Sequence, residues 1–325
     1  MKKEDIIYVT AQPDIPYFHW QVELYVHNFK KVGINPKNIH VIFSLDGYTS
    51  RPSESSKRLE NLGCNIHFFK DERNNTSYVP NVKPFLVSKW LEKFPEYGKL
   101  FFLHDSDIIF RELPDFNKLL NDDISYLSDT IGYIGYNYLK NCCDRYEFHH
   151  NNSEKLQLLK EMSNVVGIDI DLIKENEQNS GGGQYLIKNT NHEIWNKIYL
   201  DCTPLYNQML DYDKRFPIPS GQVQFWTAEM WATLWNLWKF NIKTKVVKEL
   251  DFSWATDSLY AFDLSSILHM AGVTDDLKKE MFYKGDYVNI NPIEMLRGNE
   301  NYFDYINEKS ITLKYIELMK DFIKS

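Results

Sequence analysis

The chain alternates short apolar runs with longer stretches in which apolar residues recur every three or four positions. The short runs predict buried strands, and the longer stretches predict amphipathic helices. In the first third, strands are predicted over 5–10, 38–45, 64–69 and 100–104, with helices over 17–32, 53–62 and 84–94. This alternation implies right-handed βαβ connections. We therefore expect an α/β fold with a mainly parallel central sheet and helices on both faces.

The pattern changes after residue 110. The region 126–152 is rich in Tyr, Gly and polar residues, and with a short helix over 154–162 it reads as an insertion that covers a site. Strands are then predicted over 185–188, 243–247 and 266–270, and helices over 192–210, 222–240 and 301–325. We expect the last helix to pack on the outside. The expected organisation is a single domain, with a nucleotide-binding half 1–110, an acceptor-side half 111–270 and a helical tail 271–325.

Composition narrows the class of protein. The chain has 325 residues, of which 43% are hydrophobic, so it can bury a substantial core. A net charge of -8 argues against binding nucleic acid by bulk electrostatics. No apolar run approaches the roughly 18–20 residues of a membrane span, and the first residues do not resemble a signal peptide, so a cytoplasmic protein is expected, including a phage or viral protein in its host's cytoplasm. The four cysteines lack metal-binding spacing and are expected to be reduced.

The strongest chemical signal is a pair of aspartates. Asp105 and Asp107 follow the apolar run 100–104, and apolar residues resume at Ile108. Carboxylates between hydrophobic segments are costly to bury alone, so a divalent cation, completed by a nucleotide diphosphate, is the expected partner. Asp-x-Asp also occurs in exposed turns and at helix N-termini. The flanking strands favour the metal site here.

Other candidates lie further along the chain, and each has a plainer interpretation. Gly181, Gly182 and Gly183 precede a predicted strand and allow a ligand close to the backbone, or form only a flexible turn. Glu229 lies in the Trp-rich helix 222–240 and is either a desolvated general base or an ordinary helix carboxylate. His269 is either a packed residue or a third metal ligand.

Nucleotide-binding motifs of the usual kind are missing from the sequence. It contains no Gly-x-Gly-x-x-Gly after the first strand and no P-loop, so a nucleotide must be held in another way. In a parallel sheet, ligands bind beyond the carboxyl ends of the strands. The predicted strands place Thr10, Asp46 and the aspartate pair at such ends.

These features together resemble a GT-A glycosyltransferase. Within that fold, the chain is similar to the hydroxyproline O-arabinosyltransferase and peptidyl-serine galactosyltransferase group. The motifs that carry the likeness are Tyr17-Phe-His-Trp-Gln21, Asn81-Val-Lys-Pro84, Asp105-Ser-Asp-Ile108, Glu112-Leu-Pro-Asp115, Ala228-Glu-Met-Trp231 and Leu268-His-Met-Ala271.

The resemblance implies a role for each matching residue. Asp105, Asp107 and His269 would bind Mn²⁺ or Mg²⁺, with the histidine favouring Mn²⁺, and Asp105 would also meet the nucleotide sugar. The other donor-binding residues would be Thr10 and Asp46 at the nucleoside, Lys83 at the ribose or diphosphate, Gly181 to Gly183 at the sugar, and Lys284 at the leaving diphosphate. If configuration is inverted, Glu229 or, second, Asp263 would take the acceptor's proton. If it is retained, that assignment fails.

The function implied is transfer of a sugar, with arabinose or galactose favoured, from a UDP-sugar to an acceptor hydroxyl. The related plant enzymes carry a membrane anchor, and none is expected here, so the acceptor stays open: a glycan, a protein side chain, or a hydroxymethylated base in phage DNA. Two other classes remain. A metal-dependent hydrolase of nucleotide diphosphates would use the same carboxylates, and a non-catalytic carbohydrate- or nucleotide-sugar-binding protein would keep the fold without turnover.

Overall fold

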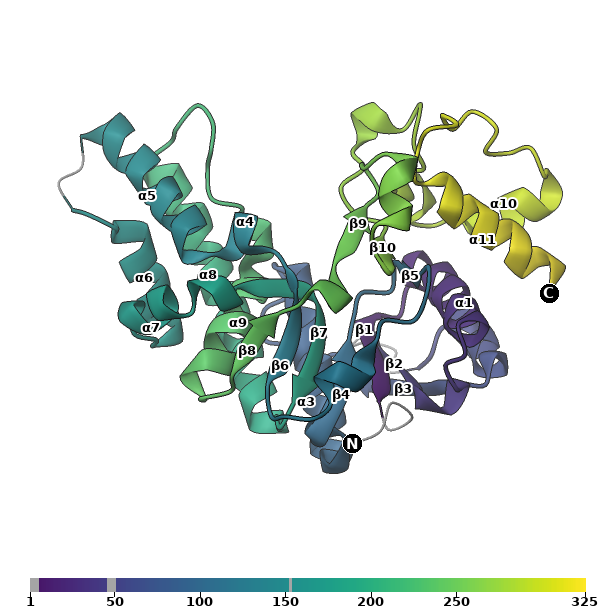
Figure 1. Ribbon diagram of the computed structural model, residues 1–325, viewed down its shortest axis with the longest axis horizontal. Helices are drawn as coiled ribbons and strands as arrows, with labels where there is room; N and C mark the ends of the chain where they lie inside the picture. Colours follow the sequence, from purple (N-terminus) through teal and green to yellow (C-terminus); the bar gives the residue numbers. More distant parts are fainter. Residues whose placement is uncertain (1–5, 46–50, 152–153) are drawn as a thin grey trace. The chain divides into compact units, whose positions relative to one another are not determined.

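The computed structural model describes residues 6–45, 51–151 and 154–325, and it is an α/β structure with two sheets (Figure 1). The larger sheet has seven strands in the order β3-β2-β1-β4-β7-β6-β8, and the smaller has three in the order β5-β10-β9. The chain divides into two compact units that interleave along the sequence. The first comprises Met1–Asp71, His104–Lys118 and Glu249–Ser325, and the second comprises Glu72–Leu103 and Leu119–Lys248.

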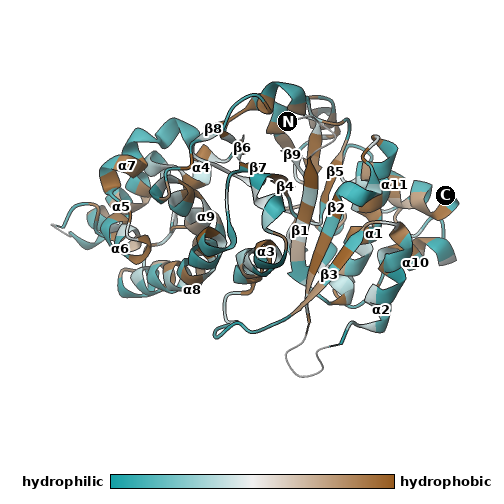
Figure 2. Cartoon of the chain, turned by 90° about the horizontal axis from the view of Figure 1, so that it is seen from below, coloured by the Kyte–Doolittle hydropathy of each residue, from teal (hydrophilic) through white to brown (hydrophobic). Residues whose placement is uncertain are grey.

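Three parallel strands open the first unit. They are β1 (Ile7–Pro13), β2 (Ile39–Leu45) and β3 (Asn65–Lys70), and the helices between them are α1 (Pro16–Lys31) and α2 (Glu54–Lys57). Every residue of β2 is buried, as expected for a strand with neighbours on both sides. Figure 2 shows the apolar character of these strands in brown. The predicted strands are confirmed, but β1 continues to Pro13, so the expectation that Thr10 ends its strand is wrong.

The rest of the first unit comes from distant parts of the chain. It contains β5 (Ile108–Phe110), β9 (Phe252–Trp254), β10 (Ile267–His269), α10 (Pro292–Gly298) and α11 (Leu313–Lys324). The helices α1 and α11 lie side by side (Figure 1), and Asp321 of α11 accepts hydrogen bonds from His27 and Lys31 of α1 at 2.6 and 2.8 Å. The first and last helices therefore stabilise one another.

The tail differs from the expectation. Its helix begins at Leu313 instead of residue 301, because Asn299 and Asn307 accept hydrogen bonds from backbone amides two residues onward and so hold turns. The helix also contributes to the core: Tyr315 and Met319 are fully buried in a cluster with Trp20. The expectation that this helix packs on the outside is therefore wrong.

The second unit has four strands. They are β4 (Leu100–Leu103), β6 (Ser125–Asp129), β7 (Gly181–Lys188) and β8 (Thr244–Val246), and β7 runs antiparallel to both β4 and β6. Its helices are α3 (Val82–Lys93), α4 (Ile131–Ile134), α5 (Tyr136–His150), α6 (Gln157–Val166), α7 (Ile170–Glu175), α8 (His192–Arg215) and α9 (Ala228–Lys239). The predicted strands and helices after residue 180 are confirmed in kind, with shifted ends.

The region 126–151, which was expected to be part of an insertion over a site, is regular: it holds most of β6, then α4 and α5, and α5 buries Cys142, Cys143 and Tyr146 at helical spacing among polar neighbours. One expectation about this unit is wrong. The three glycines do not precede the strand, because β7 begins at Gly181. All four cysteines are free thiols, as expected. In the described part of the chain, no helix is long and apolar enough to span a membrane.

Candidate metal centre

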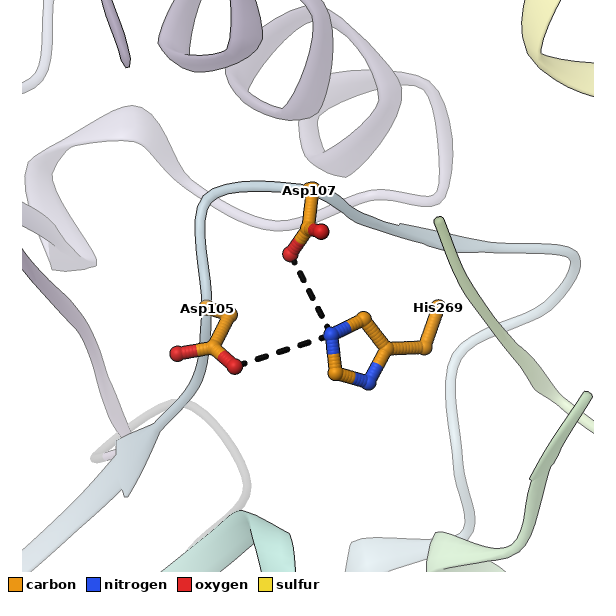
Figure 3. A group of neighbouring side chains, drawn as sticks. All are labelled: Asp105, Asp107 and His269. Carbon is orange, nitrogen blue, oxygen red and sulfur yellow. Dashed lines mark ion pairs between the residues drawn. The ribbon is translucent and has the colours of Figure 1, made fainter. Parts of the chain in front are cut away.

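Asp105, Asp107 and His269 converge in the first unit. The two aspartates lie in the turn between β4 and β5, and His269 is the last residue of β10. Their side chains point toward one another (Figure 3): the imidazole Nε2 lies 3.6 Å from Asp105 Oδ2 and 3.3 Å from Asp107 Oδ1. All three ligand atoms lie within 4.8 Å of one another.

Strand pairing brings the histidine to the aspartates. β10 is antiparallel to β5, and its register pairs His269 with Ile108, the residue after Asp107. The amide of Met270 then donates to the Asp107 carbonyl at 3.0 Å. A one-residue shift of register would turn His269 to the other face of this small sheet. The pairing of two strands about 160 residues apart in sequence therefore determines the geometry.

The turn is supported from α1. The side-chain amide of Asn28 accepts a hydrogen bond from the Phe110 amide at 2.7 Å and donates one to the Phe110 carbonyl at 2.9 Å. β5 is an edge strand, so among the described residues no neighbouring strand lies on its outer side. The Asn28 side chain takes the place of that strand as the hydrogen-bonding partner of the Phe110 amide and carbonyl. Ser106, between the two aspartates, donates to Gln21 Oε1 at 3.0 Å. Two polar residues on one helix thus hold the turn at Ser106 and the following strand at Phe110.

Aromatic rings orient the imidazole. Trp254 on β9 stacks on His269, with ring centroids 5.5 Å apart and an interplanar angle of 19°. Phe252 lies at the same centroid distance with its ring tilted. Packing of this kind restricts imidazole rotation, so Nε2 stays directed at the carboxylates.

Lys284 completes the cluster. It begins a short 3-10 helix, Lys284–Tyr287, and its ammonium group forms an ion pair and hydrogen bond with Asp107. Burial opposes ionisation of the Asp107 carboxyl, but the electrostatic interactions and hydrogen bonds with Lys284 and His269 outweigh burial and hold its pKa well below the usual range. Burial likewise disfavours the Lys284 ammonium, and Asp107 more than offsets this and raises its pKa. Both groups are therefore charged at neutral pH.

The residues fit a divalent cation. They offer two carboxylates and an imidazole, and two ligands about 2.1 Å from one ion at right angles are about 3 Å apart, close to the separations found here. A histidine binds a metal ion as the neutral imidazole, so two carboxylates, one imidazole and one ammonium give the metal-binding cluster a net charge of -1. Asp105 has 32% of its side chain exposed against 8% for Asp107 and His269, so a ligand can reach the cluster on the Asp105 side.

A second polar cluster lies in the second unit. Lys83 on α3 forms an ion pair at 3.4 Å with Glu229 Oε2, in the first turn of α9, and Thr233 donates to Glu229 Oε1 at 3.2 Å. The Glu229 amide donates to the Tyr78 hydroxyl at 2.9 Å. Glu229 is only 4% exposed. The predicted base and the lysine predicted to meet the ribose or diphosphate thus form an ion pair in this structure.

Of the other residues predicted to bind the nucleoside or to act as the base, those that the structure describes do not belong to either cluster. Thr10 is buried within β1, where its hydroxyl donates to Gln12 at 2.8 Å. Asp46 lies outside the described residues. Asp263 ends a 3-10 helix, Leu259–Asp263, and is exposed.

Packing explains two of the three glycines. A Cβ on Gly181 would lie 2.5 Å from the Ser128 carbonyl oxygen, and one on Gly182 would lie 2.6 Å from Met230 Cε. Gly183 has a φ of +82°, which favours glycine.

Sequence reasoning assigned no role to several residues of these clusters. Gln21 lies in one of the motifs used for the resemblance, but nothing in the motif indicated its bond to Ser106. Asn28, Trp254 and Tyr78 carry no motif, and their roles come from contacts between segments far apart in sequence.

Comparisons with known proteins give weak likenesses to solved structures only. No protein-family model and no curated protein sequence matches the chain. It is similar to the apo structure of the bifunctional glycosyltransferase WbbM at 9% identity and a TM-score of 0.45, covering 100% of this chain and 53% of that one. A glycosyltransferase involved in glycosylation of the major capsid of PBCV-1 is similar at 10% identity and a TM-score of 0.37, with 83% of this chain and 94% of that one covered.

Glucosyl-3-phosphoglycerate synthase from Mycobacterium tuberculosis, in complex with Mn²⁺, UDP and phosphoglyceric acid, is similar at 12% identity and a TM-score of 0.36, with 91% of this chain and 79% of that one covered.

Proposed function

We propose that this chain is a metal-dependent glycosyltransferase that moves a sugar from a UDP-sugar to an acceptor hydroxyl. The observation that carries the proposal is the convergence of Asp105, Asp107 and His269 beside the ammonium of Lys284. Hard oxygen ligands, an imidazole and an adjacent cation suit a diphosphate bound together with Mn²⁺ or Mg²⁺. The imidazole favours Mn²⁺.

In the proposed reaction, the bond between the sugar's anomeric carbon and the diphosphate oxygen breaks, and its electron pair leaves with UDP. The acceptor oxygen forms the new bond to that carbon. The bound ion would supply electrostatic stabilisation of the departing diphosphate. Lys284 adds a positive charge at the same place, because its ion pair with Asp107 fixes the ammonium beside the proposed metal ligands.

The acceptor hydroxyl must lose its proton. For transfer with inversion we propose that Glu229 accepts it, with Asp263 as the second choice. Glu229 is buried, lies in the first turn of α9 and has the ammonium of Lys83 beside it, so its charge is balanced without a hydrogen bond from water. For the donor we propose UDP-arabinose or UDP-galactose, on the strength of the short motifs that resemble the corresponding transferases.

Release of UDP tests this function. The protein is incubated with UDP-arabinofuranose, UDP-galactose or UDP-glucose, with and without Mn²⁺, and UDP is measured with water or a mixed glycan extract as acceptor. We expect release that requires Mn²⁺, is lost in Asp105→Asn and persists in Asp304→Asn, which removes an exposed carboxylate of the same unit. Absence of UDP release from all three donors, with the wild-type protein folded, would contradict the proposal.

A further inference from the structure

The eight tryptophans differ sharply in exposure. Six of them are buried, Trp254 is half-buried against His269, and Trp226 alone is 58% exposed. In the aromatic helix α9, Trp231, Trp235 and Trp238 belong to the core. A single exposed apolar residue is common in proteins and does not by itself indicate a site. The support beneath Trp226 is the informative feature.

Trp226 rests on a column of aromatic rings. Its ring meets Phe225 edge to face at 5.5 Å, and Phe225 meets Tyr206 in the same way at 5.7 Å. Tyr206 in turn stacks on Tyr78, with centroids 4.7 Å apart. Rings held by such contacts lose little further freedom when a ligand binds, so an exposed indole on this column is preorganised for binding.

One buried hydroxyl also connects Trp226 to Glu229. Tyr78 donates to the Trp226 carbonyl at 2.7 Å and accepts from the Glu229 amide at 2.9 Å. Burial raises the pKa of this hydroxyl, so it stays protonated and keeps both bonds. Trp226 lies in the 3-10 helix Phe225–Thr227, and Glu229 lies in the first turn of α9, which follows it directly. The backbone that carries the exposed indole and the backbone that carries Glu229 are therefore tied to one buried side chain.

We propose that Trp226 is the stacking platform for a sugar ring of the acceptor, which makes the acceptor a glycan. The indole face covers the C–H face of the ring, and a hydroxyl at the ring's edge lies toward Glu229 and Lys83, which accept and donate hydrogen bonds. A DNA acceptor fits less well, because the chain carries a net charge of -8 and the platform adjoins a carboxylate. The assignment of this ring to the acceptor rests on the proposed function.

The test measures binding of methyl glycosides without donor or metal. Saturation-transfer NMR with the methyl α- and β-glycosides of galactose, glucose, mannose and xylose is carried out on the wild type, Trp226→Ala and Trp226→Phe. Phe148→Ala is the control, since Phe148 is 80% exposed on α5 in the same unit. We expect at least one glycoside to bind about threefold or more weakly to Trp226→Ala, with Trp226→Phe and Phe148→Ala close to the wild type.

Several results would overturn the platform. The first is that no glycoside binds the wild type. The second is that a glycoside binds wild type and Trp226→Ala equally well. The third is that the wild type binds a single-stranded oligonucleotide containing hydroxymethylcytosine and none of the glycosides. Calorimetry of UDP binding in the presence of Mn²⁺ distinguishes failure of the Trp226 platform from failure of the proposed function. Trp226→Ala should bind UDP as the wild type does. A wild type that fails to bind UDP would contradict the transferase while the glycoside result still decides the platform.

Discussion

Replacing Asn28 with Ala should destabilise the turn that carries the metal centre. The side chain of Asn28 makes two hydrogen bonds to Phe110, and Asn28 itself is only 7% exposed. Alanine would leave both the amide and the carbonyl of Phe110 without these bonds. An unsatisfied buried backbone group costs about 1–3 kcal/mol, so the two together should cost about 2–6 kcal/mol.

The effect should be measurable at Phe110 itself. A loss of about 2 kcal/mol corresponds to about 30-fold faster amide hydrogen exchange at Phe110, followed by mass spectrometry or NMR. Because β5 pairs with β10, the same change should weaken Mn²⁺ binding at His269. Asn117→Ala, which removes an exposed amide of the same unit, is the control and should leave exchange and metal binding unchanged. Unaltered exchange at Phe110 in Asn28→Ala would refute this account of how the turn is held.

Three further predictions concern charge, pH and packing. Lys284→Met should bind Mn²⁺ at least about fivefold more tightly than wild type by calorimetry, because it changes the cluster's charge from -1 to -2, while UDP binds more weakly; unchanged affinities would contradict the role of Lys284. Burial works against the Asp14 carboxylate, but hydrogen bonds from His19 and Ser53 outweigh it and lower its pKa, so its stabilisation is complete above about pH 3.9 and disappears as the pH falls through the lowered pKa. Urea unfolding should therefore show a steeper loss of stability below about pH 3.9 for wild type than for Asp14→Asn, and coincident curves would contradict this. Gly181→Ala should lower stability by about 1–3 kcal/mol or more in the same assay, because its Cβ would meet the β6 backbone, whereas Gly132→Ala has open space around it and should not.

Local pattern was sufficient for the first third of the chain. β1, β2, β3 and β4 each coincide with a short run of mainly apolar residues, so they were visible in the sequence, as was the interruption at Asp105 and Asp107. β9 has three residues, too few for any periodicity to appear. α5 was hidden because its exposed face is strongly polar.

The contacts that build the clusters could not be read from local pattern. His269 reaches the aspartates through strand register, and the rings of Trp254 and Tyr78 act on residues in other elements. The glycine run was misread for a related reason: it permits close packing of β7 against β6, which depends on a strand that the pattern did not reveal. Exposure is equally non-local, since Trp226 and Trp231 look alike in sequence and differ completely in burial.

The central claim is that Asp105, Asp107 and His269 bind a divalent cation together with UDP. Calorimetric titration of UDP into the protein with and without Mn²⁺ tests it most directly, on wild type, Asp107→Asn, Asp105→Asn and the control Asp304→Asn. We predict that UDP binding requires Mn²⁺, weakens at least about tenfold in both site variants, and is unchanged in the control. UDP affinity that is equal with and without Mn²⁺, or equal in Asp105→Asn and wild type, would contradict the account.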